Sequence, residues 1–212
     1  MEPGSTLPNT SRIAAFSDAV IAILMTIMVL DLRPPGSELR HHTFVELMHY
    51  LTPKLTVYAL SFVIIAKMWV SHHRLFCAVT HVTTPLLWLN NLLLFWMSLI
   101  PFATGFVSED QTRPIAVATY GAILCLNAFS FTLLRHYVVT HLSPAGKDIH
   151  PHIIRYSVGA MALYALGAAL AYVSTYLSFV LFILVPIMSI PIDRDERETN
   201  GKSQSPTAAN EK

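Results

Sequence analysis

Long apolar segments alternate with short polar connections along the chain, a pattern that predicts membrane-spanning helices. The first apolar segment covers residues 12–32 and is interrupted only by Ser17, Asp18, Thr26 and Asp31. At about 1.5 Å per residue, a helix of this length crosses the roughly 30 Å hydrocarbon core of a bilayer. The same pattern predicts three further spanning helices, at about 53–76, 84–107 and 114–139.

The last apolar stretch predicts two helices. Residues 156–192 contain no charged side chain. They are too long for one span and suit two short spans joined by a tight turn near Ser174–Tyr176. The sequence therefore predicts an all-α membrane protein with one six-helix domain at 12–192, between disordered tails at 1–11 and 193–212.

The positions of Lys and Arg predict the orientation in the membrane, because cytoplasmic loops retain these residues. With an inside N-terminus, the outer side holds only Arg33, Arg40, Lys54 and Arg113. Most of the other Lys and Arg residues then face inward. Both termini are therefore predicted to be cytoplasmic.

Composition excludes several classes of function. The chain is 53% hydrophobic and 13% charged, against roughly 25% charged in ordinary soluble domains. The net charge of +1 and the lack of a basic block argue against a nucleic-acid partner. Cys77 and Cys125 lie in apolar stretches and form no disulfide framework. No GxSxG elbow or phosphate-binding Gly loop is present, so an enzyme is not expected.

Ionisable residues inside the predicted spans are candidate functional residues, because hydrocarbon makes them costly. Asp18 has plausible partners in Arg12 and in the cluster at residues 72–74. Two interpretations stay open, a polar network that holds three helices together and a direct role in transport. The network would contain Ser17, Asp18, His72, His73 and Asn90 or Asn91. Lys67 has a stem long enough to reach water or a cavity.

Ten histidines suggest a metal site, but their spacing matches no known metal signature, so no metal or cofactor is expected.

The first helix shows a clearer pattern. At about 100° per residue, Ile23, Ile27 and Leu30 fall within about 60° of one another, and Thr26 lies at the edge of this stripe. Asp18 lies about 140° from Ile23. Lipid, a neighbouring helix or a pore could each face the stripe.

Three motifs resemble the transmembrane protein 175 family of potassium channels. Residues 12–18 read R-I-A-A-F-S-D and match the RxxxFSD signature that opens the family's first helix. Trp69, His72 and His73 form a later W-x-x-H-H motif. Residues 89–92 (L-N-N-L) and 99–102 (L-I-P-F) complete the match. The resemblance covers most of 12–192 and identifies the chain as similar to the prokaryotic members.

The resemblance implies a passive, potassium-selective cation channel without a P-loop filter. Tyr120 and Gly121 also lack the surroundings of a carbonyl filter. Prokaryotic members carry one six-helix unit and assemble as homotetramers, so a tetramer in the plasma membrane is expected. Potassium would be the permeant ion. The first helix would line the pore.

The resemblance also assigns roles to residues. The constriction maps to Ile23, continued by Ile27 and Leu30, with the hydroxyl of Thr26 beside them. Asp31 would lie at the outer mouth. The residues implied to support the pore helix are Arg12, Phe16, Ser17, Asp18, His72, His73, Asn90 and Asn91. Which histidine and which asparagine matter stays open.

Two rival functions stay open as well. A proton-coupled or proton-conducting transporter would use Asp18 and His72 as its relay, since transporters use titratable groups inside their spans. A structural subunit without conductance would use the polar network and the apolar stripe only for packing. Flux measurements distinguish these two functions and the potassium channel from one another.

Overall fold

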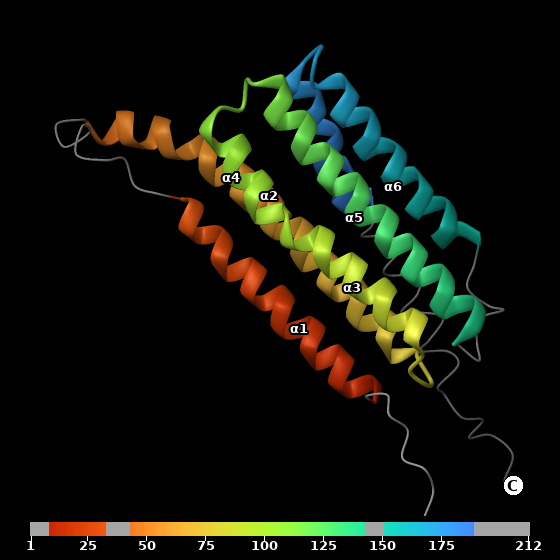
Figure 1. The fold of residues 1–212 in the computed structure, drawn as a ribbon. Helices are drawn as coiled ribbons and strands as arrows, with labels where there is room; N and C mark the ends of the chain where they lie inside the picture. Colours follow the sequence, from red (N-terminus) through yellow and green to blue (C-terminus); the bar gives the residue numbers. More distant parts are fainter. Residues whose placement is uncertain (1–8, 33–42, 143–150, 189–212) are drawn as a thin grey trace, which may run out of the picture.

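The computed structural model describes residues 9–32, 43–142 and 151–188, and regular structure in these ranges is entirely helical. The predicted all-α membrane fold with six helices is confirmed, with the third span broken into two pieces (Figure 1). The elements are α1 (Thr10–Ile27), the 3-10 turn η1 (Met28–Asp31), α2 (Phe44–Cys77), α3 (Thr84–Ser98), α4 (Ile100–Glu109), α5 (Pro114–His141), α6 (Pro151–Leu170) and a last helix, Thr175–Met188. Most of the two tails assigned from the sequence, 1–11 and 193–212, lies outside the described residues.

Four helical segments are long and apolar enough to cross a membrane: Thr10–Leu30, Phe44–Cys77, Thr84–Glu109 and Pro114–His141. The final two helices contribute shorter apolar segments, Tyr156–Leu170 and Thr175–Met188. Between them the backbone N–H groups of Val173 and Ser174 both donate to the carbonyl of Leu170. The predicted tight turn is therefore present, about two residues before its expected position.

The second helix begins nine residues earlier than the predicted start at 53, because its N-terminus is capped at Thr43. The Glu46 side chain accepts from the backbone N–H of Thr43 at 2.9 Å, which completes a capping box. Pro53 consequently lies inside α2. Side chains complete hydrogen bonds around it: Thr52 Oγ1 donates to the carbonyl of Met48, and Gln111 Nε2 donates to the carbonyl of Pro53.

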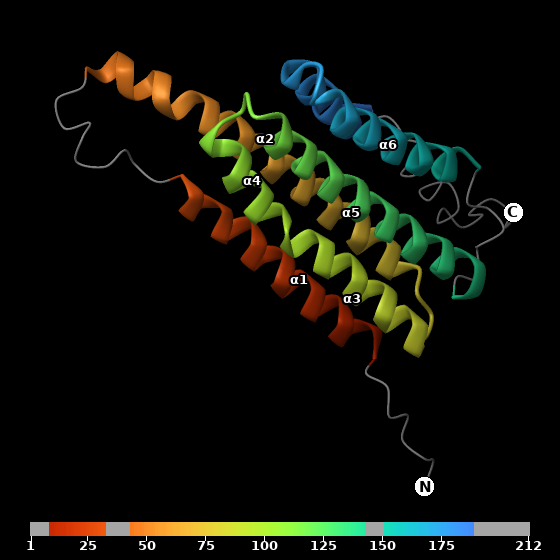
Figure 2. The same cartoon turned by 45° about the horizontal axis from the view of Figure 1, so that its top comes forward.

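The third span is broken at Leu99, where a continuous helix was predicted (Figure 2). Pro101 is the cause, because proline lacks the N–H that would continue the helix and its ring clashes with the preceding turn. Helical hydrogen bonding resumes directly after the break, since the N–H of Ala103 donates to the carbonyl of Leu99 at 3.0 Å. α4 therefore continues the span after a local irregularity.

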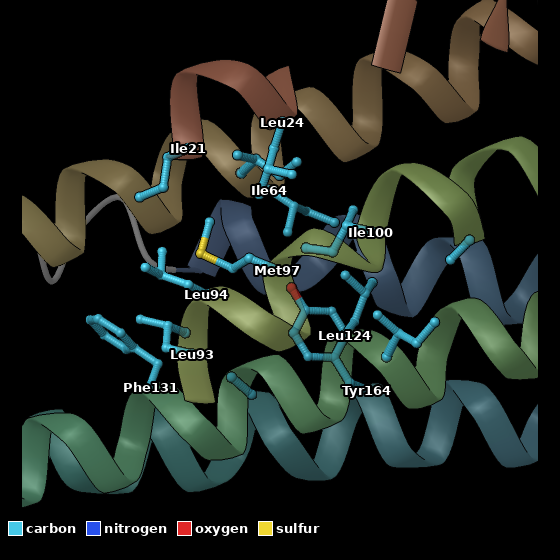
Figure 3. Packing of buried hydrophobic residues seen from close by; sticks show 14 of the residues in the cluster. Ile21, Leu24, Ile64, Leu93, Leu94, Met97, Ile100, Leu124, Phe131 and Tyr164 are labelled. Atoms are coloured by element: carbon cyan, nitrogen blue, oxygen red, sulfur yellow. The ribbon is translucent and has the colours of Figure 1, made fainter. Parts of the chain in front are cut away.

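α1 lies along one side of the bundle and α6 lies on the opposite side (Figure 2). α1 packs on α2 and α3, and η1 packs on α4, whereas α5 makes its most extensive contacts with α6. Ile21 and Leu24 of α1 point into the interior, near Ile64 of α2 and Ile100 of α4 (Figure 3). One face of α1 is therefore anchored in the core.

Two glycines let α5, α6 and the last helix approach closely around Phe182, whose side chain is fully buried. A Cβ added at Gly167 would lie 2.5 Å from Cε1 of Phe182, and one added at Gly121 would lie 2.6 Å from its Cζ. These distances are far below van der Waals contact. The two positions therefore require glycine for packing.

Gly167→Ala is expected to destabilise the protein by about 1–3 kcal/mol, because the new methyl group must displace a fully buried ring. Gly159→Ala on the same helix is the matched control, since a Cβ there meets nothing within 4 Å. Thermal unfolding of both purified variants measures the difference. Equal unfolding temperatures would contradict the close packing at Phe182.

Candidate functional site

α1 has two faces with different surroundings. The buried residues of α1 and of the η1 turn that follows it recur every three or four positions and contact the bundle: Ile13, Ser17, Ile21, Leu24 and Met28. The opposite face is exposed in the single subunit. Phe16, Ile23, Ile27 and Leu30 keep 56%, 54%, 45% and 68% of their surface accessible. The apolar stripe predicted from the sequence therefore points away from the rest of the subunit.

Thr26 contributes the polar group on this exposed face. Its Oγ1 donates to the carbonyl of Ile23 at 2.9 Å and lies 3.2 Å from the carbonyl of Ala22. The hydroxyl hydrogen is thereby turned toward the helix backbone, as is common for threonine in membrane helices. The residue is exposed, and its oxygen keeps lone pairs that can accept a hydrogen bond or coordinate a cation.

A buried polar network fixes the other face of α1. Asn90 of α3 lies at its centre and is 1% exposed. Its Nδ2 donates to Ser17 Oγ of α1 at 2.9 Å, and its Oδ1 lies 2.8 Å from His72 Nε2 of α2. Because Oδ1 can only accept, His72 Nε2 carries the hydrogen. Three helices are therefore joined through one amide.

A second contact joins α1 to α2 at the edge of this network. Trp69 Nε1 donates to Asp18 Oδ1 at 2.9 Å. The rings of Trp69 and His73 lie 6.1 Å apart, and the His72 ring stacks on Phe76 at 4.3 Å. Asp18 is thus hydrogen-bonded to an indole, while His72 is bonded to Asn90.

The structure separates the residue pairs that the sequence left undecided. His72 and Asn90 are buried in the network, whereas His73 and Asn91 are exposed. It does not bring Arg12 into the network: the side chain is exposed, and its backbone N–H donates to the Asn9 side chain, which caps α1. Asp31 ends η1, and its side chain lies outside the described part of the chain.

Another polar cluster, in the middle of the bundle, was missed by the sequence analysis. Thr104 Oγ1 of α4 donates to Ser61 Oγ of α2 at 2.7 Å, and Ser61 Oγ lies 2.9 Å from the Tyr120 hydroxyl of α5. All three side chains are buried. Small hydroxyl residues inside apolar spans were the available signal, since such residues often hydrogen-bond across helices. Among the described residues, no group of three His, Cys, Asp or Glu side chains could hold a metal ion.

Comparison with known proteins relates this geometry to a family. The family model described as "Endosomal/lysosomal potassium channel TMEM175" matches residues 12–101, which include α1 except its first two residues and the whole Asn90 network. A potassium channel of Chryseobacterium sp. is 34% identical over 190 residues, covering 88% of this chain and 95% of the relative. The chain belongs to the TMEM175 family.

Other TMEM175 proteins extend the comparison. The crystal structure of a lysosomal potassium-selective channel TMEM175 homolog from Chamaesiphon minutus matches with a TM-score of 0.76 and 28% identity, covering 84% of this chain and 95% of that one. The endosomal/lysosomal proton channel TMEM175 of Danio rerio is 21% identical, and the match covers 87% of this chain but 37% of the relative. These relatives are channels, so the prediction that the chain is not an enzyme is confirmed.

Proposed function

We propose that this TMEM175 protein is a potassium-selective channel that conducts passively through a pore lined by α1. The exposed stripe of Ile23, Thr26, Ile27 and Leu30 carries the proposal, because it lies opposite the face that the Asn90 network anchors. The potassium-channel names of the prokaryotic relatives support the choice of ion. Four copies around an axis would turn the four stripes toward one another.

An apolar constriction can select and gate ions by the cost of removing their water. At a ring of four Ile23 side chains an ion must shed part of its hydration shell, and potassium sheds water more easily than sodium. Apolar rings also dewet after small changes in radius, which makes them natural gates. The outward oxygen of Thr26 replaces part of the lost hydration, one turn beyond Ile23.

The proposal includes further assignments that were predicted from the sequence. The channel domain is 12–192, with Asp31 at the outer mouth, where four carboxylates would concentrate cations. The protein works as a homotetramer in the plasma membrane, with both termini in the cytoplasm. Arg12 and Phe16, which are exposed in the single subunit, support the pore helix through neighbouring subunits.

Flux from liposomes tests the proposal. Vesicles containing the purified protein and loaded with potassium or sodium are compared across a series of external pH values. Faster potassium efflux that persists without a proton gradient is the expected result. Equal leakage of both ions, or no flux from well-folded protein, would contradict a potassium channel.

Proton permeation is the second candidate, because the animal relatives carry the name proton channel. Asp18 and His72 are the titratable pair for such a path. Their hydrogen-bond partners differ, Trp69 for Asp18 and Asn90 for His72, so a relay would have to pass through intervening groups. Flux that disappears when the proton gradient is collapsed, and that Asp18→Asn reduces, would favour this candidate.

Thr26→Val is expected to reduce the preference for potassium over sodium several-fold while conductance persists, because valine keeps the shape but removes the oxygen. Thr26→Ser is the matched control, since it keeps the hydroxyl and should keep most of the selectivity. Reversal potentials in mixed potassium and sodium solutions measure the preference. Identical selectivity in the valine variant would exclude Thr26 from ion coordination.

A further inference from the structure

A cavity of about 370 Å³ lies at one end of the bundle and is lined by α2, by α4 with the connection to α5, and by the last helix. α2 begins, α4 ends and the last helix begins at this end (Figure 1). Because Glu109 is the last residue of the third span, the cavity lies at the predicted outer boundary of the membrane. Its volume is within the range of small-molecule sites in proteins.

The α2 side of the cavity carries a positive charge. Lys54 Nζ donates to the Tyr50 hydroxyl at 2.7 Å and lies 4.3 Å from the centre of the Tyr50 ring. An ammonium has three hydrogens, and this bond uses one of them. The Tyr50 hydroxyl accepts from Lys54, so its own hydrogen can be donated. Both side chains line the cavity and suit an anionic oxygen.

The α4 side of the cavity carries negative charge. Glu109 ends α4, Asp110 follows it, and both residues are exposed and line the cavity. Asp110 Oδ1 accepts from the hydroxyl of Thr112 at 2.6 Å and from its backbone N–H at 2.9 Å. These hydrogen bonds hold the pKa of Asp110 below its usual value, so the carboxylate is ionised at neutral pH. They use only one of its two oxygens.

A hydrogen bond joins the two sides. Gln111 Nε2 donates to the carbonyl of Pro53. Gln111 follows Asp110 in the chain and Pro53 precedes Lys54, so this bond holds opposite charges beside one cavity. Pro53 also has no N–H for the carbonyl of His49, another residue of the wall, which adds an acceptor near the carboxylates. The cavity therefore suits a ligand with one anionic and one cationic group.

We infer that this cavity binds the headgroup of phosphatidylethanolamine, which carries a phosphate and a primary ammonium. Lys54 and Tyr50 donate to the phosphate, and Glu109 and Asp110 accept from the ammonium. A choline headgroup suits the site less well, because its quaternary ammonium has no N–H to donate and Lys54 already lies over the Tyr50 ring. The site is separate from the α1 stripe and does not depend on which ion the protein conducts.

The surroundings of the cavity favour a lipid over a soluble zwitterion. Tyr176, which lines the cavity, is 78% exposed, and tyrosine is enriched where membrane helices meet the bilayer surface. Val180 and Leu184 lie one and two turns further along the same helix and are exposed as well. Since residues four apart share a helix face, this apolar surface leads from the cavity toward the hydrocarbon, where it can contact acyl chains.

Native mass spectrometry of the full-length, detergent-purified protein tests the inference. Retained lipid is counted after incubation with phosphatidylethanolamine, and phosphatidylcholine with the same acyl chains is the comparison. The wild-type protein should retain phosphatidylethanolamine preferentially. Lys54→Gln and Glu109→Gln should each lower its retention by about fivefold, the effect of one charge at a lipid surface.

Two further variants keep the test decisive. Lys54→Arg preserves the charge and should preserve the preference, which separates charge from folding. Arg74→Gln removes a charge in the last turn of α2, at the opposite end of the helix, and should leave retention unchanged. Equal retention of both lipids by the wild type would overturn the inference, as would a preference that Lys54→Gln and Glu109→Gln leave intact. Displacement of the lipid by millimolar phosphoethanolamine, a soluble compound with the same two groups, would overturn the assignment to a lipid.

Discussion

Replacing Ile23 by asparagine is expected to increase ion flux at least about tenfold and to weaken the preference for potassium. A tenfold increase corresponds to lowering the barrier by about 1.4 kcal/mol. The amide offers oxygen and N–H groups where the wild-type ring offers only hydrocarbon, so ions pass with more of their water. Sodium gains more than potassium, because its hydration shell is the more costly to remove.

Ion efflux per folded protein and reversal potentials in mixed potassium and sodium solutions measure both effects. Ile183→Asn is the matched control, with the same substitution at an exposed position of the last helix. That helix packs against α5 and α6 through Phe182, away from the α1 stripe. Unchanged flux and selectivity in Ile23→Asn would remove Ile23 from the constriction. If the wild-type protein shows no flux and Ile23→Asn changes only the stability of the oligomer, the result would favour a structural subunit without conductance.

Replacing Asn90 by alanine is expected to destabilise the protein by about 1–3 kcal/mol and to loosen α1. The substitution leaves Ser17 Oγ and His72 Nε2 without their shared partner, and a buried unsatisfied group costs about 1–3 kcal/mol. The total stays below the sum of two such penalties, because polar groups of an unfolded chain in a membrane find other partners. The neighbouring Asn91 is exposed. Asn91→Ala should change stability by less than about 0.5 kcal/mol.

Thermal unfolding and the yield of assembled protein are compared for the two asparagine variants. A second matched pair, His72→Ala and His73→Ala, examines the same network from α2 and should show the same asymmetry. Equal effects within each pair would contradict a network centred on Asn90. Because α1 carries the proposed pore face, the fraction of Asn90→Ala protein that folds should also show altered conductance.

Several elements of the fold were predictable because a bilayer restricts the alternatives. Apolar segments of spanning length must satisfy their own backbone hydrogen bonds, so hydropathy alone predicted the six helices and the turn near residue 174. Two predicted helix boundaries were wrong, because hydropathy does not indicate helix caps or proline breaks. The capping box at Thr43 starts α2 in a polar segment, and Pro101 breaks the third span inside an apolar one.

The candidate site was likewise predictable from the sequence only in part. The 3.6-residue period of a helix groups Ile23, Ile27 and Leu30 from sequence alone, because their angular positions depend only on their spacing. Their exposure in the subunit depends on which face of α1 the neighbouring helices cover. That choice follows from packing at Ile21 and Leu24 against residues distant in sequence, such as Ile64.

The sequence by itself determined the membrane class, the helix count, the family motifs and the stripe on α1, since each depends on composition or local periodicity. Only the tertiary structure showed that His72 and Asn90, rather than His73 and Asn91, are buried in the network, because adjacent residues on a helix point about 100° apart and only one of them can face a given neighbour. The Ser61–Thr104–Tyr120 cluster could not be predicted for a different reason. Its members are ordinary residues in sequence, and helices from distant parts of the chain bring them together.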